Sequence, residues 1–477
     1  MSSPDAIVVG SGPNGLAAAV TLGRAGLSVL VLEAESTIGG GARSAELTLP
    51  GFVHDLGSAI HPFAYASPFF RTLPLPRYGL HWVRPPAALA HPLEDGRAVM
   101  LENSLPRMCE ALAEDGRAYR RLIEPARHLL DTVLAEPSPG RLLPRALAAN
   151  RALFSALRPA VKVANGSFHR PETRALVAGM AAHSMLPLEK AGTAGVALAL
   201  LTAAHVGGWP FPRGGAQKIS DALTAHLQSL GGRVEINHAV RSLDELPLAR
   251  AILFDLTPRQ IIAIAGSSFP PGYVRSLQRF RYGIAAFKMD WALSAPVPWK
   301  SAELRRAATV HLGGTLEEIA SAERVPWRGG VSERPFVIVA QHSLFDATRA
   351  PQDKHTLWAY CHVPFGSEED MTGRIEAQIE RFAPGFRDCI LARSVLPPHK
   401  LQQMNQNLIG GDITGGMQDL PQTFVRPTWR YWTTPLRNMY ICSSSTPPGV
   451  GVHGMCGHWA AKVALRRSFG VRTELQI

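Results

Sequence analysis

Short apolar runs separated by glycine-rich turns open the chain. Residues 6–9 are apolar and rich in β-branched side chains, and a glycine turn divides them from an apolar run over residues 16–24 that has helical spacing. A second β-rich run follows at residues 28–32. This order predicts a strand, a turn, a helix and a second strand, which is the arrangement of a βαβ unit with parallel strands.

The same kinds of pattern recur farther along the chain. They predict strands at residues 233–240, 251–258, 284–293 and 439–442, and helices at residues 191–206, 223–230 and 456–467. The run at 191–206 belongs to the longest uncharged stretch, but glycines and prolines end that stretch before the ~20 apolar residues that a membrane span needs. It is therefore predicted to be a buried helix.

The first turn has the composition of a phosphate-binding loop. Gly10, Gly12 and Gly15 form a G-x-G-x-x-G pattern directly between the strand and the helix. Gly10 permits a tight turn, Gly12 lets the backbone approach a pyrophosphate, and Gly15 lets the helix pack closely on its strand. The N–H groups at the positive end of the helix dipole then face the phosphates. The candidate residues of this turn are Gly10, Ser11, Gly12, Pro13, Asn14 and Gly15.

An acidic residue follows at the end of the second strand. Glu33 lies eighteen residues after Gly15, where a carboxylate can accept hydrogen bonds from an adenosine ribose. An acid at this place favours an unphosphorylated ribose, as in FAD or NAD, and the neighbouring Ala34 is included in the candidate contact. No second strand, G-x-G-x-x-G turn and helix follow in the sequence, so a separate NAD(P)H domain is not expected.

Two further turns favour FAD. Gly39-Gly40-Gly41-Ala42-Arg43-Ser44 resembles the G-G-x-x-R-S signature of the carotenoid desaturase and flavin amine oxidase superfamily, and of its phytoene desaturase-like members in particular. His54-Asp55-Leu56-Gly57-Ser58 is similar to the D-x-G-[AS] turn that runs under the cofactor in this family. The resemblance implies FAD contacts at Gly40, Gly41, Ala42, Arg43, Gly57 and Ser58. Arg43 is expected to meet a phosphate or the flavin edge.

The C-terminal region resembles the same family. Residues 440–454 are similar to its L-Y-[LI]-C-G…P-G-G-G-V-x-G stretch, which places a helix N-terminus against the pyrimidine end of the flavin and so stabilises negative charge there. The implied contacts are Ser444, Gly451, Val452 and His453. Ser443 and Ser444 depart from the family's usual glycine and aspartate. His453 and His458 receive no catalytic role, because a histidine beside a glycine turn is more often a packed side chain.

Three internal segments add to the resemblance. Residues 212–219 are similar to the turn that re-enters the cofactor domain, and Val240 matches a valine that lies beside the adenine. Residues 287–293 resemble the F-K-V-D-[WY]-A-L of one subgroup, and residues 407–427 follow the same subgroup except that Thr-Gly replaces its Phe-His. Lys288 faces either the active cavity or, in the preferred interpretation, a carboxylate on a neighbouring strand. No catalytic residue is assigned.

The resemblance implies an α/β fold class with a Rossmann-type, discontinuous FAD-binding domain of the glutathione reductase-like kind and an inserted α+β substrate domain. FAD-binding segments are expected at residues 1–77, 207–275 and 395–477. The insertions at 78–206, largely helical, and 276–394, with mixed sheet and helices, match the family only loosely. They are expected to build a pocket over the flavin.

Composition, net charge and cysteine spacing argue against several classes of function. The chain has 477 residues, 46% of them hydrophobic, which agrees with a folded protein. Its net charge of +11 favours anionic partners, but no basic-aromatic module or zinc spacing accompanies it, so nucleic-acid binding is not expected. The five cysteines are scattered without a C-x-x-C pair, which argues against a metal site or a disulfide reductase. The N-terminus runs straight into the nucleotide motif, and a cytoplasmic location is expected.

A basic amphipathic helix is predicted in the first insertion. Arg141, Arg145, Arg151, Arg158 and Lys162 alternate there with leucines and other apolar residues. Its apolar face packs on the core in the preferred interpretation. In the alternative, the helix makes peripheral contact with an anionic membrane and admits a lipid-like substrate.

The leading hypothesis for function is an FAD-dependent dehydrogenase or oxidase that removes a hydride from an apolar substrate, with oxygen, a quinone or another carrier as electron acceptor. The alternatives are a flavin amine oxidase, a non-redox flavin isomerase and a non-catalytic lipid-binding or escort protein on the same fold. The three motif glycines, Glu33 and the C-terminal turn argue against the escort protein. The sequence does not specify the substrate, the acceptor or the oligomeric state.

Overall fold

A five-stranded parallel sheet brings the two ends of the chain together. The computed structural model, which describes residues 3–135 and 150–471, orders the strands β16-β10-β1-β2-β9. They are β1 (Ala6–Val9), β2 (Val29–Leu32), β9 (Arg233–Glu235), β10 (Ala251–Phe254) and β16 (Met439–Ile441). Every neighbouring pair is parallel, so the carboxyl ends of all five strands lie at one edge of the sheet.

Helices cover both faces of this sheet, which explains why its strands are apolar at successive positions. Val8 packs in the core on one face and Val9 in the core on the other. The helices on the first face are α1 (Pro13–Gly23), α11 (Gln217–Ser229) and α18 (Met455–Ser468), and those on the second are α12 (Pro258–Ala265) and α13 (Pro271–Gln278).

The second large sheet has seven strands, in the order β15-β11-β14-β13-β12-β6-β7. Its strands are β6 (Ala87–Pro92), β7 (Ala98–Glu102), β11 (Ala285–Leu293), β12 (Ala307–Leu312), β13 (Val337–Ala340), β14 (His355–Val363) and β15 (Ile390–Leu396). All neighbours are antiparallel except β12 and β6. Phe287 on one face packs against α15 (Thr372–Phe382), while Ala286 on the other faces a helical layer.

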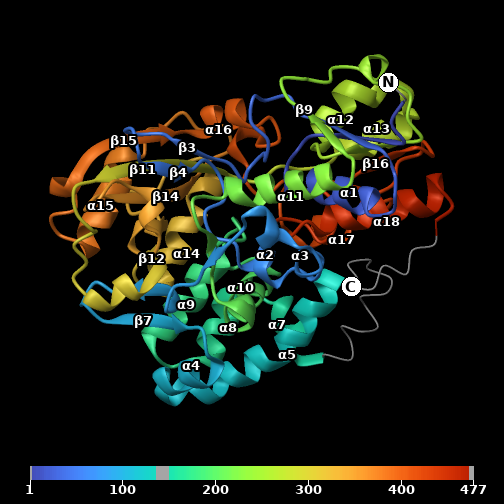
Figure 1. Cartoon of the computed structure of the whole chain (residues 1–477). Helices are drawn as coiled ribbons and strands as arrows, with labels where there is room; N and C mark the ends of the chain where they lie inside the picture. Colours follow the sequence, from blue (N-terminus) through green and yellow to red (C-terminus); the bar gives the residue numbers. More distant parts are fainter. Residues whose placement is uncertain (1–2, 136–149, 472–477) are drawn as a thin grey trace.

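This helical layer lies against the seven-stranded sheet (Figure 1). Its members are α4 (Leu105–Ala111), α5 (Gly116–Ala135), α7 (Asn150–Ala156), α8 (Ala160–Ser167), α9 (Pro171–Ala182), α10 (Thr193–Gly207) and α14 (Leu316–Arg324). Helix α10 is buried along much of its length, which confirms the helix expected at 191–206. Among the helices of the described residues, none combines the length and the apolarity needed to cross a bilayer.

Short elements connect these layers. They are β3 (Ser44–Glu46), β4 (Val53–Asp55), α2 (Pro62–Ala66), α3 (Pro68–Arg71), β5 (Trp82–Val83), β8 (Phe211–Pro212), α16 (Pro398–Met404) and α17 (Leu420–Phe424), together with several 3-10 turns. Strand β3 pairs with β4, and β5 pairs with β8. The β3–β4 hairpin carries the turn at residues 54–58 that the sequence places under the cofactor.

The fold class predicted from the sequence is confirmed, with three local corrections. Strand β9 ends at Glu235 and not at residue 240, because Asn237 adopts a φ of 55° and the chain turns there. Strand β10 ends at Phe254, since Thr257 begins the capping box of α12. The basic amphipathic helix is not continuous: residues 136–149 lie outside the described part, and Pro159 separates α7 from α8.

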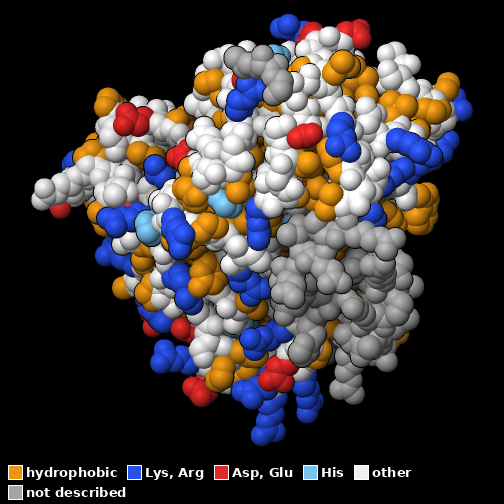
Figure 2. Space-filling model, turned by 45° about the vertical axis from the view of Figure 1, so that its right-hand side comes forward, with side chains coloured by type: hydrophobic (Ala, Val, Ile, Leu, Met, Phe, Trp, Pro, Cys, Tyr) orange, Lys and Arg blue, Asp and Glu red, His pale blue; other side chains and the backbone are white. Residues whose placement is uncertain are grey.

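The positive charge is distributed over the surface. Figure 2 shows Lys and Arg side chains across much of the visible face, with apolar side chains between them and no single basic stripe. Peripheral contact with an anionic membrane, and the boundaries assigned to the five segments, stay predictions.

Candidate functional site

One large cavity opens at the carboxyl edge of the five-stranded sheet and extends to the seven-stranded sheet. Its volume of about 700 Å³ is within the range of small-molecule and cofactor sites. Most residues that the sequence singled out line it: Gly10, Ser11, Gly12, Pro13, Asn14, Glu33, Ala34, Gly40, Gly41, Ala42, Arg43, Gly57, Ser58, Val240, Ser444, Gly451 and Val452. Gly15 and His453 do not. The structure therefore gathers most of the candidates around one space, and their contact with a cofactor stays a prediction.

The first glycine turn has no room for side chains. Gly10 has a φ of +99°, which L side chains rarely adopt. A Cβ on Gly12 would lie 2.5 Å from Oδ2 of Asp255, and a Cβ on Gly15 would lie 2.2 Å from the carbonyl oxygen of Gly10. Gly15 thus packs against the backbone of the turn on the side away from the cavity, and it does not line the cavity.

The start of α1 fits a diphosphate. Gly12 is the N-cap residue and provides no side-chain cap, and Pro13 at the first helical position lacks an N–H group. The Oδ1 atom of Asn14 is buried without a hydrogen-bond partner. The N-terminus of a helix beside an open cavity offers backbone N–H groups and the positive end of the helix dipole to an anion.

Glu33 sits where a ribose would be recognised. It follows the end of β2, and its carboxylate accepts hydrogen bonds from the backbone and hydroxyl of Ser11 and from the backbone N–H of Glu35. Its side chain is buried but lines the cavity, as do Val240 and His238 on the neighbouring connection. Each carboxylate oxygen has two lone pairs, so Glu33 keeps acceptor capacity for ribose hydroxyls.

Arg43 is largely committed to the protein. Its guanidinium donates to the carbonyl oxygen of Gly40, to the hydroxyl of Thr37 and to the carbonyl oxygen of Met404. Burial lowers the pKa of this guanidinium. Three of its five N–H groups are used in this way, so its first role is to hold the Gly39–Ser44 loop, and two N–H groups are left for a ligand.

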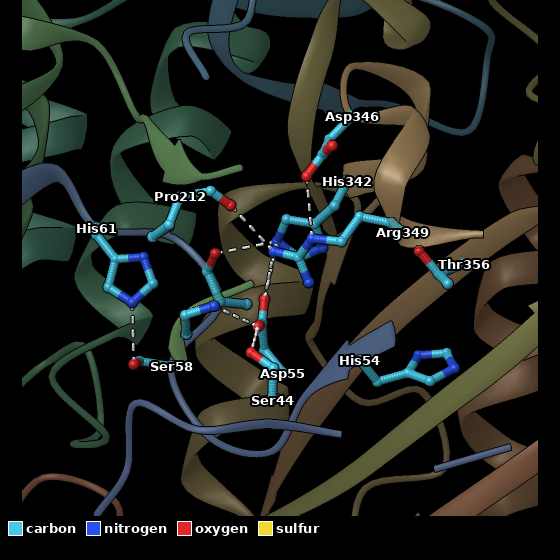
Figure 3. A network of polar contacts seen from close by, with 12 residues as sticks. Ser44, His54, Asp55, Ser58, His61, Pro212, His342, Asp346, Arg349 and Thr356 are labelled. Atoms are coloured by element: carbon cyan, nitrogen blue, oxygen red, sulfur yellow. Dashed lines mark hydrogen bonds and ion pairs between the residues drawn. The ribbon is translucent and has the colours of Figure 1, made fainter. Parts of the chain in front are cut away.

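A buried ionic network supports the turn at residues 54–58 (Figure 3). Arg349 is fully buried, and its Nη2 lies 3.0 Å from Oδ2 of Asp55 while its Nε lies 3.3 Å from Oδ2 of Asp346. Asp55 also accepts hydrogen bonds from the hydroxyl of Ser44 and the N–H of Ala216. Although burial opposes it, the Arg349 charge holds the pKa of Asp55 below its ordinary value. The network ties the β3–β4 hairpin to the loop after β13.

Next to this network, Ser58 and His61 border the cavity. Their side chains are 3.0 Å apart, and burial lowers the pKa of His61 to about 3. His61 is thus neutral at physiological pH and acts as a hydrogen-bonding group.

The C-terminal turn lines the same cavity. Ser444, Val450, Gly451 and Val452 line it, and Gly451 has a φ of +129°. His453 is buried, and its Nδ1 accepts the N–H of Met455 at 3.0 Å, so it caps α18 and does not line the cavity.

His458 is also a packing residue. It lies 3.0 Å from the Thr21 hydroxyl and stacks on Phe69. Together with the capping contact of His453, this agrees with the interpretation that neither histidine is catalytic.

Helices α1 and α18 are in backbone contact. A Cβ on Gly457 of α18 would lie only 1.8 Å from the carbonyl oxygen of Asn14. The N-terminal turn and the C-terminal turn are thereby held on either side of the same cavity.

One face of the seven-stranded sheet forms the far wall of the cavity. In register across it lie Lys288, Tyr360 and Ile338, and in the next row Asp290, Trp358 and Ala340. The helical side contributes Leu200, Trp209 and His183, and the remaining walls include Phe63, Leu401, Met404, Leu408 and Ile413. These walls are mainly apolar and aromatic, which favours an apolar ligand.

The two interpretations of Lys288, a side chain that faces the cavity and one that pairs with a carboxylate, are each correct in part. It lines the cavity, yet its ammonium pairs with Asp290, which lies two residues along the same strand and not on a neighbouring strand. Burial lowers the pKa of Lys288 and raises that of Asp290 to about 6. Since side chains two residues apart on a strand share a face, the spacing Lys-x-Asp already contained this contact.

Several wall residues were not predicted. Asp255, His61, His183, Trp358 and Tyr360 all line the cavity. His183 pairs with His311, whose Nε2 lies 3.0 Å away. Only Asp255 had a visible sequence signal, as a charged residue directly after the apolar strand at 251–254.

Comparisons with known proteins agree with this geometry. Residues 8–73 match the model of the NAD(P)-binding Rossmann-like domain. The chain is 26% identical to pyridine nucleotide-disulfide oxidoreductase domain-containing protein 2 of Rattus norvegicus, over an alignment that covers 97% of this chain and 93% of that protein. A redesigned putrescine oxidase superposes with a TM-score of 0.64 at 18% identity, covering 98% of this chain and 99% of that one.

The chain has the fold of the FAD-type oxidoreductases. A shorter match, 28% identical over 141 residues, is to one of the polypeptides of limonene dehydrogenase from Castellaniella defragrans, and it covers 29% of this chain and 25% of that polypeptide.

Proposed function

We propose that this protein is an FAD-dependent oxidoreductase that removes a hydride from an apolar, lipid-like organic substrate. The observation that carries the proposal is the single cavity that runs from the glycine turn and Glu33, past the C-terminal turn, to an apolar wall on the seven-stranded sheet. Gly10–Asn14 would hold the diphosphate, Glu33 the ribose, and Gly451–Val452 the pyrimidine end of the ring. Bound there, FAD would supply a two-electron acceptor that is reoxidised by oxygen, a quinone or another carrier.

The protein's own contribution is to exclude water and to align the substrate. Leu200, Ile338 and Met404 are apolar, and Trp358 and Tyr360 present rings to the same space. The match to the limonene dehydrogenase polypeptide, which is named for an apolar terpene, supports a substrate of this class. Effective alignment of the reacting atoms in such a site is a large part of the rate enhancement.

Amine oxidation is the second candidate. Trp358 and Tyr360 stand edge to face with centroids 5.2 Å apart, and the ammonium of Lys288 lies 5.9 Å from the Trp358 ring. The wall thus already holds one cation over an aromatic face, an environment that also suits a substrate ammonium.

A spectroscopic experiment tests the proposal. The purified protein, supplied with FAD, should show a protein-bound flavin absorption band, and Glu33→Ala should weaken FAD binding by at least about tenfold through loss of charged hydrogen bonds. Glu46→Ala, at an exposed position of β3, should bind FAD like the wild type.

Anaerobic mixing then separates the two candidates. Bleaching of the flavin band by terpene hydrocarbons supports the first, and bleaching by primary amines alone supports the second. A wild-type protein that binds no FAD would contradict both and would favour a non-catalytic carrier.

A further inference from the structure

Asp255 is a buried acid directly beneath the first glycine turn. It follows the last residue of β10, and its backbone N–H donates to the carbonyl oxygen of Val9 at 2.8 Å, next to Gly10. Its side chain is 6% exposed and lines the cavity. The parallel pairing of β1 and β10 therefore delivers this carboxyl to the place where the diphosphate is expected.

The Asp255 carboxyl occupies the N-terminal end of α1. Its Oδ2 accepts the backbone N–H of Gly15 at 2.9 Å. A Cβ at Gly12 would lie 2.5 Å from the same oxygen, so the carboxyl is wedged between these two glycines. Because the N-cap residue of α1 makes no side-chain cap, Asp255 caps the helix from a neighbouring strand.

The surroundings of Asp255 disfavour a negative charge. Among the described residues no Lys or Arg forms an ion pair with it. The titratable groups that face it are Glu33 and the thiols of Cys442 and Cys456. Glu33 adds like charge, and burial raises the pKa of Cys456 to about 12 and that of Cys442 well above its ordinary value, so both thiols stay neutral.

Burial therefore raises the pKa of Asp255 to about 7, even though the N–H groups of Gly15 and Gly12 act in the opposite direction. In the free protein the carboxyl is about half ionised near neutral pH.

We propose that Asp255 takes up one proton when FAD binds, so that a neutral carboxyl lies beside the diphosphate. The inference rests on the proposed function. A diphosphate brings two negative charges to the N–H groups that Asp255 already faces, and two anions cannot both be stabilised there. The protonated carboxyl keeps an oxygen to accept the Gly15 N–H and gains an O–H group that can donate to a phosphate oxygen. The proton comes from solvent or buffer: an O–H or N–H bond of the proton donor breaks, and an O–H bond forms on the Asp255 carboxyl.

Thermodynamic linkage between proton binding and FAD binding gives the sign of the pH dependence of FAD affinity. Diphosphate binding raises the pKa of Asp255 further, so the bound form holds more protons than the free form above pH 7. FAD affinity should then fall by up to about tenfold for each pH unit above 7. Below pH 6 this carboxyl is protonated in both forms and should contribute no pH dependence.

Calorimetry tests the proposal directly. The heat of FAD binding at pH 8, measured in two buffers of different ionisation enthalpy, should show uptake of close to one proton by the wild type. Asp255→Asn, which keeps the acceptor oxygen for Gly15 and carries no charge, should show uptake close to zero. Its FAD affinity at pH 8.5 should exceed that of the wild type by about tenfold or more. Asp244→Asn, which removes an exposed carboxylate, is the matched control and should behave like the wild type.

The comparison with Asp255→Asn also removes the contribution of His238, which lines the same cavity. Equal proton uptake by the wild type and Asp255→Asn, or a wild-type value near zero, would overturn the inference while FAD binding itself stands. The second of these outcomes needs the wild type alone, so the inference can be refuted even if the variant does not fold. Absence of FAD binding at every pH would instead overturn the proposed function.

Discussion

The glycines of the first turn are required by backbone contacts and not by ligand contacts alone. Gly15 does not line the cavity, yet its Cα faces the carbonyl oxygen of Gly10 and the side chain of Asp255. A side chain at this position would have to displace backbone, which cannot rotate away as a flexible side chain can. The motif thus shapes the turn before any cofactor is present.

We expect Gly15→Ala to destabilise the fold by about 1–3 kcal/mol, because the new methyl group overlaps backbone atoms of the turn. It should also lower FAD content after reconstitution, since Gly12 and Asn14 move with the turn. Gly373→Ala is the control: this helical position has open space around a Cβ, and the change should be neutral or slightly stabilising. Chemical denaturation and flavin absorbance measure both effects, and a wild-type unfolding midpoint for Gly15→Ala would contradict the expectation.

At the scale of elements, the Arg349 network joins a loop of the seven-stranded sheet to the short strands β4 and β8. Arg349 lies in the loop between β13 and β14, and its partner Asp55 is the last residue of β4 (Figure 3). It also lies 3.5 Å from the carbonyl oxygen of Pro212 in β8. One fully buried guanidinium thus links the loop before β14 to β4, which leads into the Gly57–Ser58 turn.

Arg349→Met should cost about 3–5 kcal/mol in the free energy of unfolding, because it leaves the buried Asp55 carboxylate without its counter-ion. Asp55→Asn combined with Arg349→Met should recover part of that loss, since no unpaired charge is then buried. Arg328→Met, at an exposed position, should change stability by less than about 0.5 kcal/mol. Urea unfolding of the wild type, Arg349→Met, Asp55→Asn and the double variant tests this cycle, with Arg328→Met measured beside them, and strictly additive costs would show that the two side chains are not coupled.

At the scale of the whole molecule, buried neutral histidines dominate the acid response. Burial lowers the pKa of His54, His61, His183 and His458 to about 3 and that of His91, His205, His342 and His453 to about 4. An unfolded histidine binds its proton below about pH 6.5, whereas these folded ones do not. Each therefore stabilises the fold fully above pH 6.5 and loses that contribution as the pH falls toward its folded pKa.

We expect the melting temperature to fall steeply between pH 6.5 and pH 4. Asp255 and Asp290 act in the opposite direction, because their raised pKa values, about 7 and about 6, make their protonated forms the stable ones in the fold. The histidines outnumber these two acids, so the net slope of stability against pH should be positive throughout this window. Calorimetric scans at half-unit pH steps would show it, and a flat profile would mean that the histidines are charged in the fold.

Sequence patterns predicted the dinucleotide fold and most of the cavity wall around it. Gly10, Gly12 and Glu33 occupy local positions in a βαβ unit, and local spacing is enough to place them. Arg43 was correctly placed at the cavity, but three of its N–H groups bind protein acceptors, including the carbonyl oxygen of the distant Met404, which spacing does not reveal.

The far wall of the cavity could not be predicted from the sequence, because tertiary structure brings its residues together. His183, Lys288 and Tyr360 meet only because antiparallel register and a helix from another segment bring them to one space. The predicted partner of Lys288 was wrong for a different reason: it was expected on a neighbouring strand, whereas Asp290 lies two residues along the same strand, a local contact that the spacing already allowed.

By itself, the sequence determined the elements whose geometry is local: a strand ending in a glycine turn, a helix starting at Pro13, an acid after the second strand. Tertiary structure alone decided that Asp255, from a strand more than two hundred residues away, caps that helix, and that α18 lies in backbone contact with it. The physical reason is range. Dihedral preferences and hydrophobic periodicity act over a few residues, whereas the electrostatics of a buried site are set by whichever groups the folded chain leaves without water.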